Sequence, residues 1–260
     1  MIIMRSALRT RRGAHCDAVL LFTVVLAILF PSLVVGDELL MGGMTWMTQY
    51  PATWNAGAPK VVSDGLHDYA VLCGFSSSQT LCSVVRKRGL EGWTQGGATW
   101  ISVQPPVAVI DRKGRLNIFY NDPQLHHIRF DHPSVDILHW VEIPTRFSGP
   151  VAYLHAGYDA SIDTIMLAFN ETTTWTVYFA VKYTDVNDWI ISTLPSADPN
   201  TLYLYARTLH AGGRYFVLVG EHPRGSPNAN YTAAILFESA SPFGPWGTRV
   251  IHRVTGENAG

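Results

Sequence analysis

Four short apolar runs separated by polar turns decide the fold, and they are clearest in residues 149–194, GPVAYLHAGYDASIDTIMLAFNETTTWTVYFAVKYTDVNDWIISTL. Valine, isoleucine and aromatic residues dominate the runs, which is the composition of β-strands. The expected strands are Val151–Ala156, Thr164–Asn170, Trp175–Lys182 and Ile190–Leu194. No segment after residue 36 shows a sustained helical period, so the sequence predicts an all-β fold.

The four-run unit recurs along the chain in phase with tryptophan. Five tryptophans are spaced by 47, 47, 49 and 57 residues, namely Trp46, Trp93, Trp140, Trp189 and Trp246. Apolar runs that follow a proline recur in step with them, after Pro59, Pro106, Pro150 and, more loosely, Pro199. Two markers in phase indicate an internal structural repeat.

Four-stranded repeats of about 40–50 residues are typical of β-propeller blades. The repeat units are approximately 57–105, 106–148, 149–197 and 198–254, within a domain spanning 37–260. Leu39–Thr48 resembles the last strand of a preceding unit. The sequence therefore predicts a β-propeller of four to five four-stranded blades, either closed or incomplete. An up-and-down barrel or a sandwich is the alternative architecture.

Residues 1–36 have the features of a signal peptide. The first 12 residues carry four arginines and no acid, Ala18–Phe30 is uncharged, and small residues precede Asp37. This order is typical of a cleaved secretory leader, which predicts a secreted or extracytoplasmic protein. Because the apolar stretch extends to Val35, an uncleaved N-terminal helix that anchors the chain is the alternative.

Charge and motifs exclude several classes of partner. The chain has 19 basic and 20 acidic residues, a net charge of −1 and a pI near 6.8. Without an excess of cations, nucleic-acid binding is not expected, and no membrane contact is expected after signal cleavage. The sequence lacks a phosphate-binding loop, a dinucleotide fingerprint and an H-E-x-x-H motif, so we expect no cofactor and no metal.

Cys73 and Cys82 lie symmetrically about Ser77-Ser78, the expected tip of a hairpin. They would therefore face each other across two strands. In an oxidising compartment this predicts a disulfide, with two buried thiols as the alternative.

The fourth unit carries a family resemblance. It runs from Asp198-Pro199 through Gly212-Gly213-Arg214-Tyr215-Phe216 to Ser239-Ala240-Ser241-Pro242-Phe243-Gly244-Pro245-Trp246. These stretches resemble blades of the five-bladed glycosidase propellers of the arabinanase and arabinofuranosidase type, which often end in S-x-S-P-x-G-P-W. The similarity covers 57–250 in pattern and 198–246 closely. It implies that a furanoside or related glycan binds in an axial funnel.

Such enzymes hydrolyse glycosidic bonds with paired carboxylates. Carried over by position, only Asp198 matches the family's set, as the surviving base. Ser148 stands where the family has the glutamate of E-G-P, and the corresponding residues Ala58 and Pro105 do not titrate. The set is incomplete. A glycoside hydrolase-like protein and a non-catalytic extracellular propeller that binds a glycan or a protein therefore both remain open.

Polar residues on the innermost strands are the expected substrate contacts. Alternation places Tyr203, Tyr205 and Arg207 on one face of their strand. Aromatic rings stack on sugars, and an arginine can bind a carboxylate through two hydrogen bonds. The alternative role of these three side chains is packing between blades. His155 lies on the preceding innermost strand and is a further candidate contact. Asp198 has the alternative role of capping the turn before Pro199.

Overall fold

The structure is a computed structural model that describes residues 61–76, 79–131, 140–195, 198–225 and 231–254, all within the compact unit Thr45–Gly260. The expected signal peptide 1–36, the expected strand Leu39–Thr48 and its Trp46 lie outside the described residues. Among the described residues, no helix is long and apolar enough to span a membrane.

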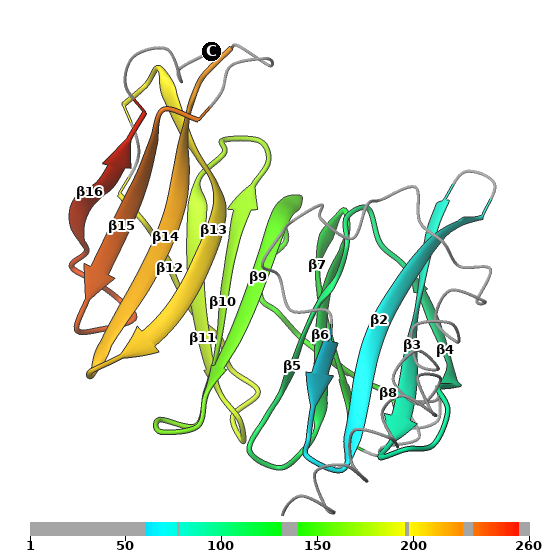
Figure 1. The fold of residues 1–260 in the computed structure, drawn as a ribbon. Helices are drawn as coiled ribbons and strands as arrows, with labels where there is room; N and C mark the ends of the chain where they lie inside the picture. Colours follow the sequence, from blue (N-terminus) through cyan, green and yellow to red (C-terminus); the bar gives the residue numbers. More distant parts are fainter. Residues whose placement is uncertain (1–60, 77–78, 132–139, 196–197, 226–230, 255–260) are drawn as a thin grey trace, which may run out of the picture. The chain divides into compact units, whose positions relative to one another are not determined.

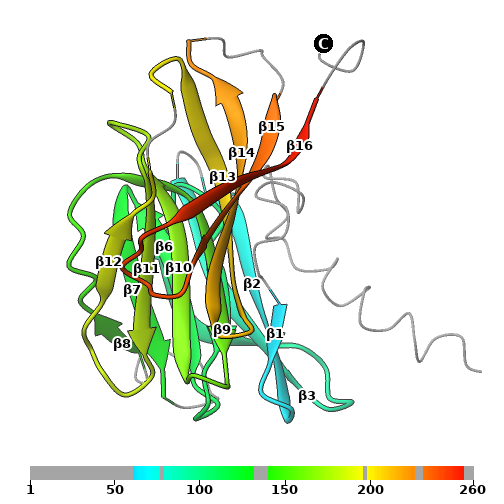
Figure 2. The ribbon, with the colours of Figure 1, turned by 90° about the vertical axis from the view of Figure 1, so that its left-hand side faces the viewer.

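The described residues form sixteen strands in four antiparallel sheets, and each sheet follows the order of the chain (Figure 1). The first contains β1 (Val61–Ser63), β2 (His67–Ser76), β3 (Gln79–Arg88) and β4 (Thr94–Ile101). The second contains β5 (Val107–Ile110), β6 (Leu116–Asp122), β7 (Gln124–Phe130) and β8 (Trp140–Ile143). The third contains β9 (Val151–Asp159), β10 (Thr164–Glu171), β11 (Val177–Tyr183) and β12 (Ile190–Thr193). The fourth contains β13 (Thr201–Ala211), β14 (Arg214–Pro223), β15 (Ala233–Ser239) and β16 (Gly247–Arg253), with β16 nearest the viewer in Figure 2.

Successive sheets contact each other through their first strands, since β5 is a neighbour of β1, β9 of β5, and β13 of β9. Three apolar clusters fill the spaces between the first and second, second and third, and third and fourth sheets. The all-β prediction is confirmed, and the four four-stranded sheets are consistent with an incomplete β-propeller. We call the sheets blades 1 to 4.

An aspartate stabilises the turn between the first two strands in both blade 1 and blade 2. Asp64 Oδ1 accepts hydrogen bonds from the backbone of Leu66 (2.8 Å) and His67 (2.7 Å). Asp111 Oδ1 accepts hydrogen bonds from the backbone of Lys113 (2.9 Å) and Arg115 (3.1 Å), in a turn that is one residue longer. An aspartate that bonds the backbone of its own turn is a common turn former. These carboxylates therefore have a structural role.

Cys73 and Cys82 are directly paired across β2 and β3 and form a disulfide. The hairpin prediction placed both residues correctly, and the disulfide prediction is confirmed. The bridge joins the second and third strands of blade 1, next to the core that this blade shares with blade 2.

The expected strand Trp175–Lys182 begins later in the structure. Strand β11 starts at Val177, and Trp175 lies in the preceding turn with a φ of 61°. Thr173 and Thr174 donate hydrogen bonds to Glu171, and this contact closes the turn ahead of Trp175. The β-propensity of tryptophan and threonine favoured a strand here, but the turn contacts prevailed.

Candidate functional site

Tyr153 and Tyr205 occupy the same position in blades 3 and 4. Each lies in a bulge of the first strand of its blade. In blade 3 the pairing of β9 with β10 shifts between Ala168 and Asn170 of β10. In blade 4 the pairing of β13 with β14 shifts between Leu204 and Arg207 of β13. Both have a left-handed backbone, with φ of 57° and 54°. For a residue other than glycine this conformation costs about 1–2 kcal/mol, and such strain is concentrated at functional sites.

Trp175, the third aromatic residue with a left-handed backbone, extends this pair into a stack. The ring of Tyr153 lies 6.1 Å from that of Trp175 and 4.2 Å from that of Tyr205. Tyr231 meets Tyr205 edge-on at 5.8 Å. We call Tyr153, Trp175, Tyr205 and Tyr231 the aromatic row. It joins blades 3 and 4 through residues that are far apart in the sequence.

The phenol groups of the row influence one another's pKa values. Tyr205 lies next to both Tyr153 and Tyr231. Burial, and then the neighbouring Tyr205, raises the pKa of Tyr153 to about 12. The same two causes raise the pKa of Tyr231. Both phenols therefore keep their protons at neutral pH and can donate hydrogen bonds.

Amide side chains from the preceding blade fix the backbone near the row. Asn170 Nδ2 donates to the carbonyl of Tyr203 at 2.6 Å, as Asn121 Nδ2, at the same position of blade 2, donates to Val151 at 2.7 Å. Gln104 Oε1 accepts a hydrogen bond from the backbone of Tyr153 at 2.6 Å. These contacts hold each bulged strand against the blade before it, which gives the strained tyrosines a defined position.

A crevice of about 270 Å³ opens beside Trp175. It lies between the β10–β11 turn, the start of β13 and the end of β14. Its polar and aromatic lining includes Thr174, Trp175, Thr176, Asp198, Tyr203 and Arg224. This volume is close to the lower end of the usual range for small-molecule sites. Two of the residues predicted from the sequence, Asp198 and Tyr203, are thus brought together.

Asp198 is exposed, and its contacts are those of a turn former. Its Oδ1 accepts a hydrogen bond from the backbone of Asn200 at 2.8 Å. Its carbonyl accepts hydrogen bonds from the backbone (2.8 Å) and the hydroxyl (3.1 Å) of Thr201. The carboxylate lies on the wall of the crevice but has no second carboxylate among the residues that line it.

Tyr203 and Arg207 do not share one face of β13. Tyr203 packs edge-on against Phe237 at 5.4 Å, within the core between blades 3 and 4. Arg207 lines a different groove with Leu218 and Leu236. The bulge at Tyr205 interrupts the alternation that predicted a common face, because it adds a residue on one strand. The expected set of Tyr203, Tyr205 and Arg207 is therefore divided between two surfaces.

His155 stabilises the contact between blades. It is 9% exposed, and its Nδ1 accepts a hydrogen bond from the backbone of Thr208 at 3.2 Å. It occupies the position in β9 that Arg207 occupies in β13. Since His155 is not among the residues that line the crevice, the structure assigns it a contact between first strands.

Glu171 and Glu221 occupy equivalent positions at the ends of the second strands, and both are engaged. Burial would raise the pKa of Glu171, but hydrogen bonds from Thr173 and Thr174 outweigh it and lower the pKa to about 2. Glu221 accepts a bond from Thr232 at 2.8 Å and pairs with Arg253 at 3.2 Å. An ionised Glu171 cannot act as the general acid that glycoside hydrolysis requires.

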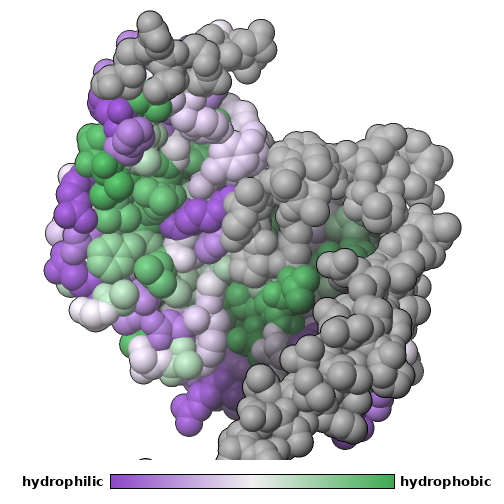
Figure 3. Space-filling view, viewed as in Figure 1, coloured by the Kyte–Doolittle hydropathy of each residue, from purple (hydrophilic) through white to green (hydrophobic). Residues whose placement is uncertain are grey.

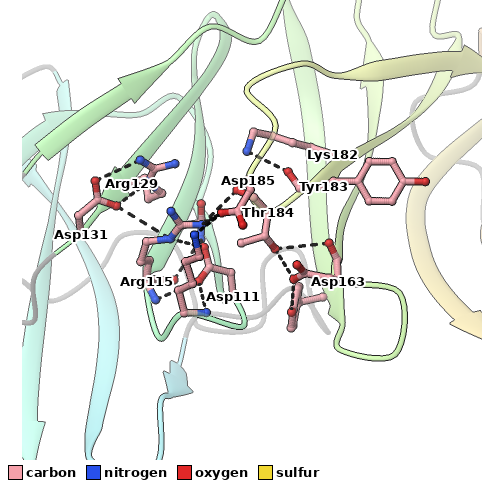
Figure 4. Close-up of polar contacts among 12 residues, drawn as sticks. Asp111, Arg115, Arg129, Asp131, Asp163, Lys182, Tyr183, Thr184 and Asp185 are labelled. Carbon is pink, nitrogen blue, oxygen red and sulfur yellow. Dashed lines mark hydrogen bonds and ion pairs between the residues drawn. The ribbon is translucent and has the colours of Figure 1, made fainter.

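A second polar cluster lies between blades 2 and 3, and Figure 4 shows it. Arg115 Nε lies 2.8 Å from Asp111 Oδ2, and its Nη2 donates to the carbonyl of Thr184 at 3.1 Å. Lys182 from β11 is 1% exposed, and burial lowers its pKa to about 8, with Arg129 and Arg115 adding to the effect. We call Asp111, Arg115, Arg129 and Lys182 the charged network. Its contacts join one blade to the next.

His127 in β7 lies beside the charged network and is fully buried. Asn117 Nδ2 donates to Asp111, so Asn117 Oδ1 accepts the Nε2 proton of His127 at 2.9 Å. Burial, and then the charges of Lys182 and Arg129, lowers the pKa of His127 well below its usual value. His127 is therefore neutral and packs on Phe119 with ring centroids 4.4 Å apart. Among the described residues, no group of three or more ligand side chains could hold a metal ion.

Sequence reasoning missed Tyr153, Trp175, Tyr231 and Arg224. A signal for Tyr153 was present, because it follows Pro150 at the start of its unit and precedes Tyr205 by one repeat. Nothing in the linear pattern connected Trp175 or Arg224 to that position. They reach the crevice from a turn and from the end of a strand, and the repeat does not extend to these places.

No protein-family model and no curated protein matches the chain. Solved structures of similar fold include a GH43 β-1,3-galactosidase with 12% identity, which covers 74% of this chain and 45% of that one, with a TM-score of 0.49. A xylan β-1,4-xylosidase from Bacillus halodurans is 13% identical over 77% of this chain and 43% of that one, with a TM-score of 0.47.

A GH43 endo-arabinanase from Bacillus licheniformis is 12% identical over 75% of this chain and 80% of that one, with a TM-score of 0.45. The chain spans less than half the length of the first structures that it matches. At these identities the likeness concerns the fold alone.

Proposed function

We propose that this protein is a secreted, glycoside hydrolase-like propeller that binds a carbohydrate, a furanoside or related glycan, in the crevice between blades 3 and 4. One observation carries the proposal: three stacked aromatic residues, Tyr153, Trp175 and Tyr205, all have a left-handed backbone. Strain of this kind persists only where the surroundings enforce it, and it often accompanies a binding role. The disulfide Cys73–Cys82 and the leader-like residues 1–36 support an extracytoplasmic location.

The crevice has the chemistry that a sugar ring requires. Trp175 contributes an aromatic ring to the lining, and Arg224 and Asp198 contribute a donor and an acceptor. Sugars present apolar C–H faces and a rim of hydroxyl groups, which suits one ring face with a few polar groups. The volume of about 270 Å³ favours a single sugar unit over a long chain in this crevice.

Binding without hydrolysis is favoured over catalysis. Glu171 remains ionised, Glu221 is paired with Arg253, and Asp198 alone supplies a carboxylate to the wall of the crevice. Hydrolysis requires two carboxyl groups placed on either side of the bond. We therefore propose that the crevice holds a glycan and leaves it intact.

The test is calorimetric titration of residues 37–260 with arabinose, xylose, galactose and their short oligosaccharides. We expect one of these ligands to bind, and Trp175→Ala to weaken binding about tenfold, which corresponds to the loss of one good aromatic contact. Phe243→Ala is the matched control, because Phe243 is 69% exposed and does not line the crevice. Equal affinities of the two variants would refute this site.

Release of reducing sugar from arabinan and aryl glycosides tests the catalytic question. We expect no release above background from the wild-type protein or from Asp198→Asn. Release that Asp198→Asn abolishes would show that the crevice is an active site and that the non-catalytic proposal is wrong.

A further inference from the structure

Blade 2 carries a second crevice, which we call the blade 2 crevice. It has a volume of about 450 Å³, within the usual range for small-molecule sites. It opens at the start of β7, beside the end of β8 and the linker that leads to blade 3. Its polar and aromatic lining includes Gln124, His126, Glu142, Thr145 and Phe147.

The repeat places the blade 2 crevice at the same position as the crevice beside Trp175. Leu125 lines the one and Val177 lines the other. These two residues are equivalent in register, because they pair with Asn121 and Asn170 of the second strands. In both blades the lining also includes residues at or just after the end of the fourth strand, where the chain leaves the blade. The same element of the repeat therefore forms a crevice twice.

The linker after β8 has a fixed shape at the edge of the blade 2 crevice. The Thr145 hydroxyl donates a hydrogen bond to the carbonyl of Leu125 at 3.2 Å. Arg146 has a left-handed backbone, with a φ of 58°, and its Nη2 lies 2.8 Å from Asp188 of blade 3. A residue other than glycine rarely adopts this conformation, and where it does, the surroundings enforce it, often at a ligand site.

The polar side chains of the lining have hydrogen-bonding capacity left for a ligand. Glu142 is 63% exposed, and its Oε1 lies 3.4 Å from His126 Nδ1. The ring of His126 lies flat on Tyr120, at an interplanar angle of 11° and a centroid distance of 4.7 Å, which fixes its orientation. Within the part of the chain that the structure describes, the side-chain amide of Gln124 has no hydrogen bond. A carboxylate, an imidazole and an amide are thus available together.

The charge of the blade 2 crevice favours a neutral ligand over an anionic one. Among the described residues that line it, Glu142 is the only carboxylate, and there is no lysine or arginine. Burial, and then the negative charges of Glu142 and Asp122, raises the pKa of Tyr120 to about 12. The same two carboxylates would repel an acidic ligand.

The apolar part of the lining lies inside the crevice and not on an open face. Leu125 and Ile143 are buried, and Phe147 packs edge-on against two aromatic rings of blade 3 at 4.9 and 4.8 Å. Blade 4 differs, because Figure 3 shows hydrophobic surface over part of the fourth sheet, whose groove is lined by Leu218 and Leu236. A crevice that combines polar and apolar groups suits a small polar molecule, whereas an open apolar face suits a macromolecule.

We propose that the blade 2 crevice is a second carbohydrate site, which takes a neutral sugar unit and rejects an acidic one. A sugar ring has apolar C–H faces and hydroxyl groups that both donate and accept hydrogen bonds. Phe147 and the buried apolar side chains contact the ring, and Gln124, His126 and Glu142 bind its hydroxyl groups. The inference rests on the proposed function, since this crevice has the position in the repeat at which we propose that blades 3 and 4 bind a glycan.

Amide chemical shifts of isotope-labelled residues 37–260 test the inference, because they report the two crevices separately and detect weak binding. Galactose or xylose should shift the amides of residues 124–126 and 142–147. Galacturonate, the acidic counterpart of galactose, should not shift them at the same concentration. No shift with any of the three, or equal shifts with galactose and galacturonate, would overturn the inference.

Glu142→Gln keeps the size of the side chain and removes its charge. It should weaken the binding of the neutral sugar at these amides about tenfold, because a hydrogen bond to a charged acceptor is roughly twice as strong as one to a neutral acceptor. Asp122→Asn is the matched control, because Asp122 is exposed and close to the crevice but does not line it. It should leave the affinity unchanged. Equal effects of the two variants would show a response to net charge alone, and the assigned site would be wrong.

The amides of Thr174 and Trp175 distinguish this inference from the proposed function. Shifts at these two amides without shifts at the blade 2 crevice would overturn the second site and leave the first. The absence of shifts at both places would overturn both. In Trp175→Ala the shifts at the blade 2 crevice should persist with unchanged affinity, and their loss would show that the molecule has one site and not two.

Discussion

The contact between blades 2 and 3 carries the charged network, beside the turn that follows the first strand, whereas the contact between blades 3 and 4 carries the aromatic row, near the start of the first strands. His127 of blade 2 and Phe179 of blade 3 are equivalent in register, and each packs against the tryptophan of the next blade. Around His127 lies the charged network. The contact between blades 3 and 4, to which Phe179 belongs, carries the aromatic row. One repeat therefore supports both a buried ionic contact and a strained aromatic stack.

The difference separates a structural contact from a binding surface. In the charged network, Asp111 bonds Arg115 and Asn117 as well as the turn backbone, so its acceptor atoms are used within the protein. Of the aromatic row, Trp175 instead lines a crevice. A polar group that is already hydrogen-bonded gains little from a ligand, whereas an accessible ring face remains available for one.

The largest expected effect is on the charged network. Asp111→Ala should lower the free energy of unfolding by about 3–5 kcal/mol, because it removes a buried carboxylate that pairs with Arg115 and accepts hydrogen bonds from Asn117 and the turn backbone. Asp185→Ala is the matched control. Its carboxylate is 58% exposed, and exposed ion pairs contribute about 0–1 kcal/mol. Urea denaturation measures both, and equal losses would show that the network is no more than a surface feature.

The next effect concerns Lys182, whose pKa is lowered to about 8 in the folded protein. Below pH 8 the lysine is charged in both states, so its burial destabilises the fold. As the pH rises from 8 toward the unfolded value of 10.5, the folded lysine loses its proton first and this cost disappears. The free energy of unfolding should therefore rise by about 1.5 kcal/mol between pH 8 and 9.5.

Lys182→Met provides the control for this pH dependence. The variant should lack the rise between pH 8 and 9.5 and should be more stable than the wild-type protein at pH 7. Tyr153 acts in the opposite sense, because its raised pKa of about 12 removes stability only above pH 10. Denaturation curves at half-unit steps of pH distinguish the two. A parallel rise in Lys182→Met would assign the effect to another group.

The sequence predicted the strands and the repeat well, because both depend on local patterns. Alternating apolar runs, prolines at unit starts and the tryptophan period anticipated all four sheets, and the symmetric spacing of Cys73 and Cys82 anticipated their pairing. The bulges at Tyr153 and Tyr205 were not predicted. Strict alternation assumes an uninterrupted ladder, and the extra residue shows only when the opposite strand is placed.

The candidate site was predicted only in part for the same reason. Asp198 and Tyr203 lie at the start of a unit, where the repeat drew attention to them, and both line the crevice. Trp175 and Arg224 come from a turn and a strand end that approach this start only through the packing of two blades. Contacts between blades depend on three-dimensional register, which a linear period does not contain.

The smallest expected effect tests whether the aromatic row stores backbone strain. Tyr205→Gly removes a partly buried ring, but glycine adopts the φ of 54° without the usual penalty, so relief of about 1–2 kcal/mol offsets part of the loss. Tyr203→Gly, two residues away in β13 and without a left-handed φ, removes a similar ring with no such relief. Tyr205→Gly should therefore be more stable than Tyr203→Gly by about 1 kcal/mol in urea denaturation. Equal stabilities would mean that the left-handed conformation carries no measurable strain, and the aromatic row would then lose the feature that separates it from ordinary packing between blades.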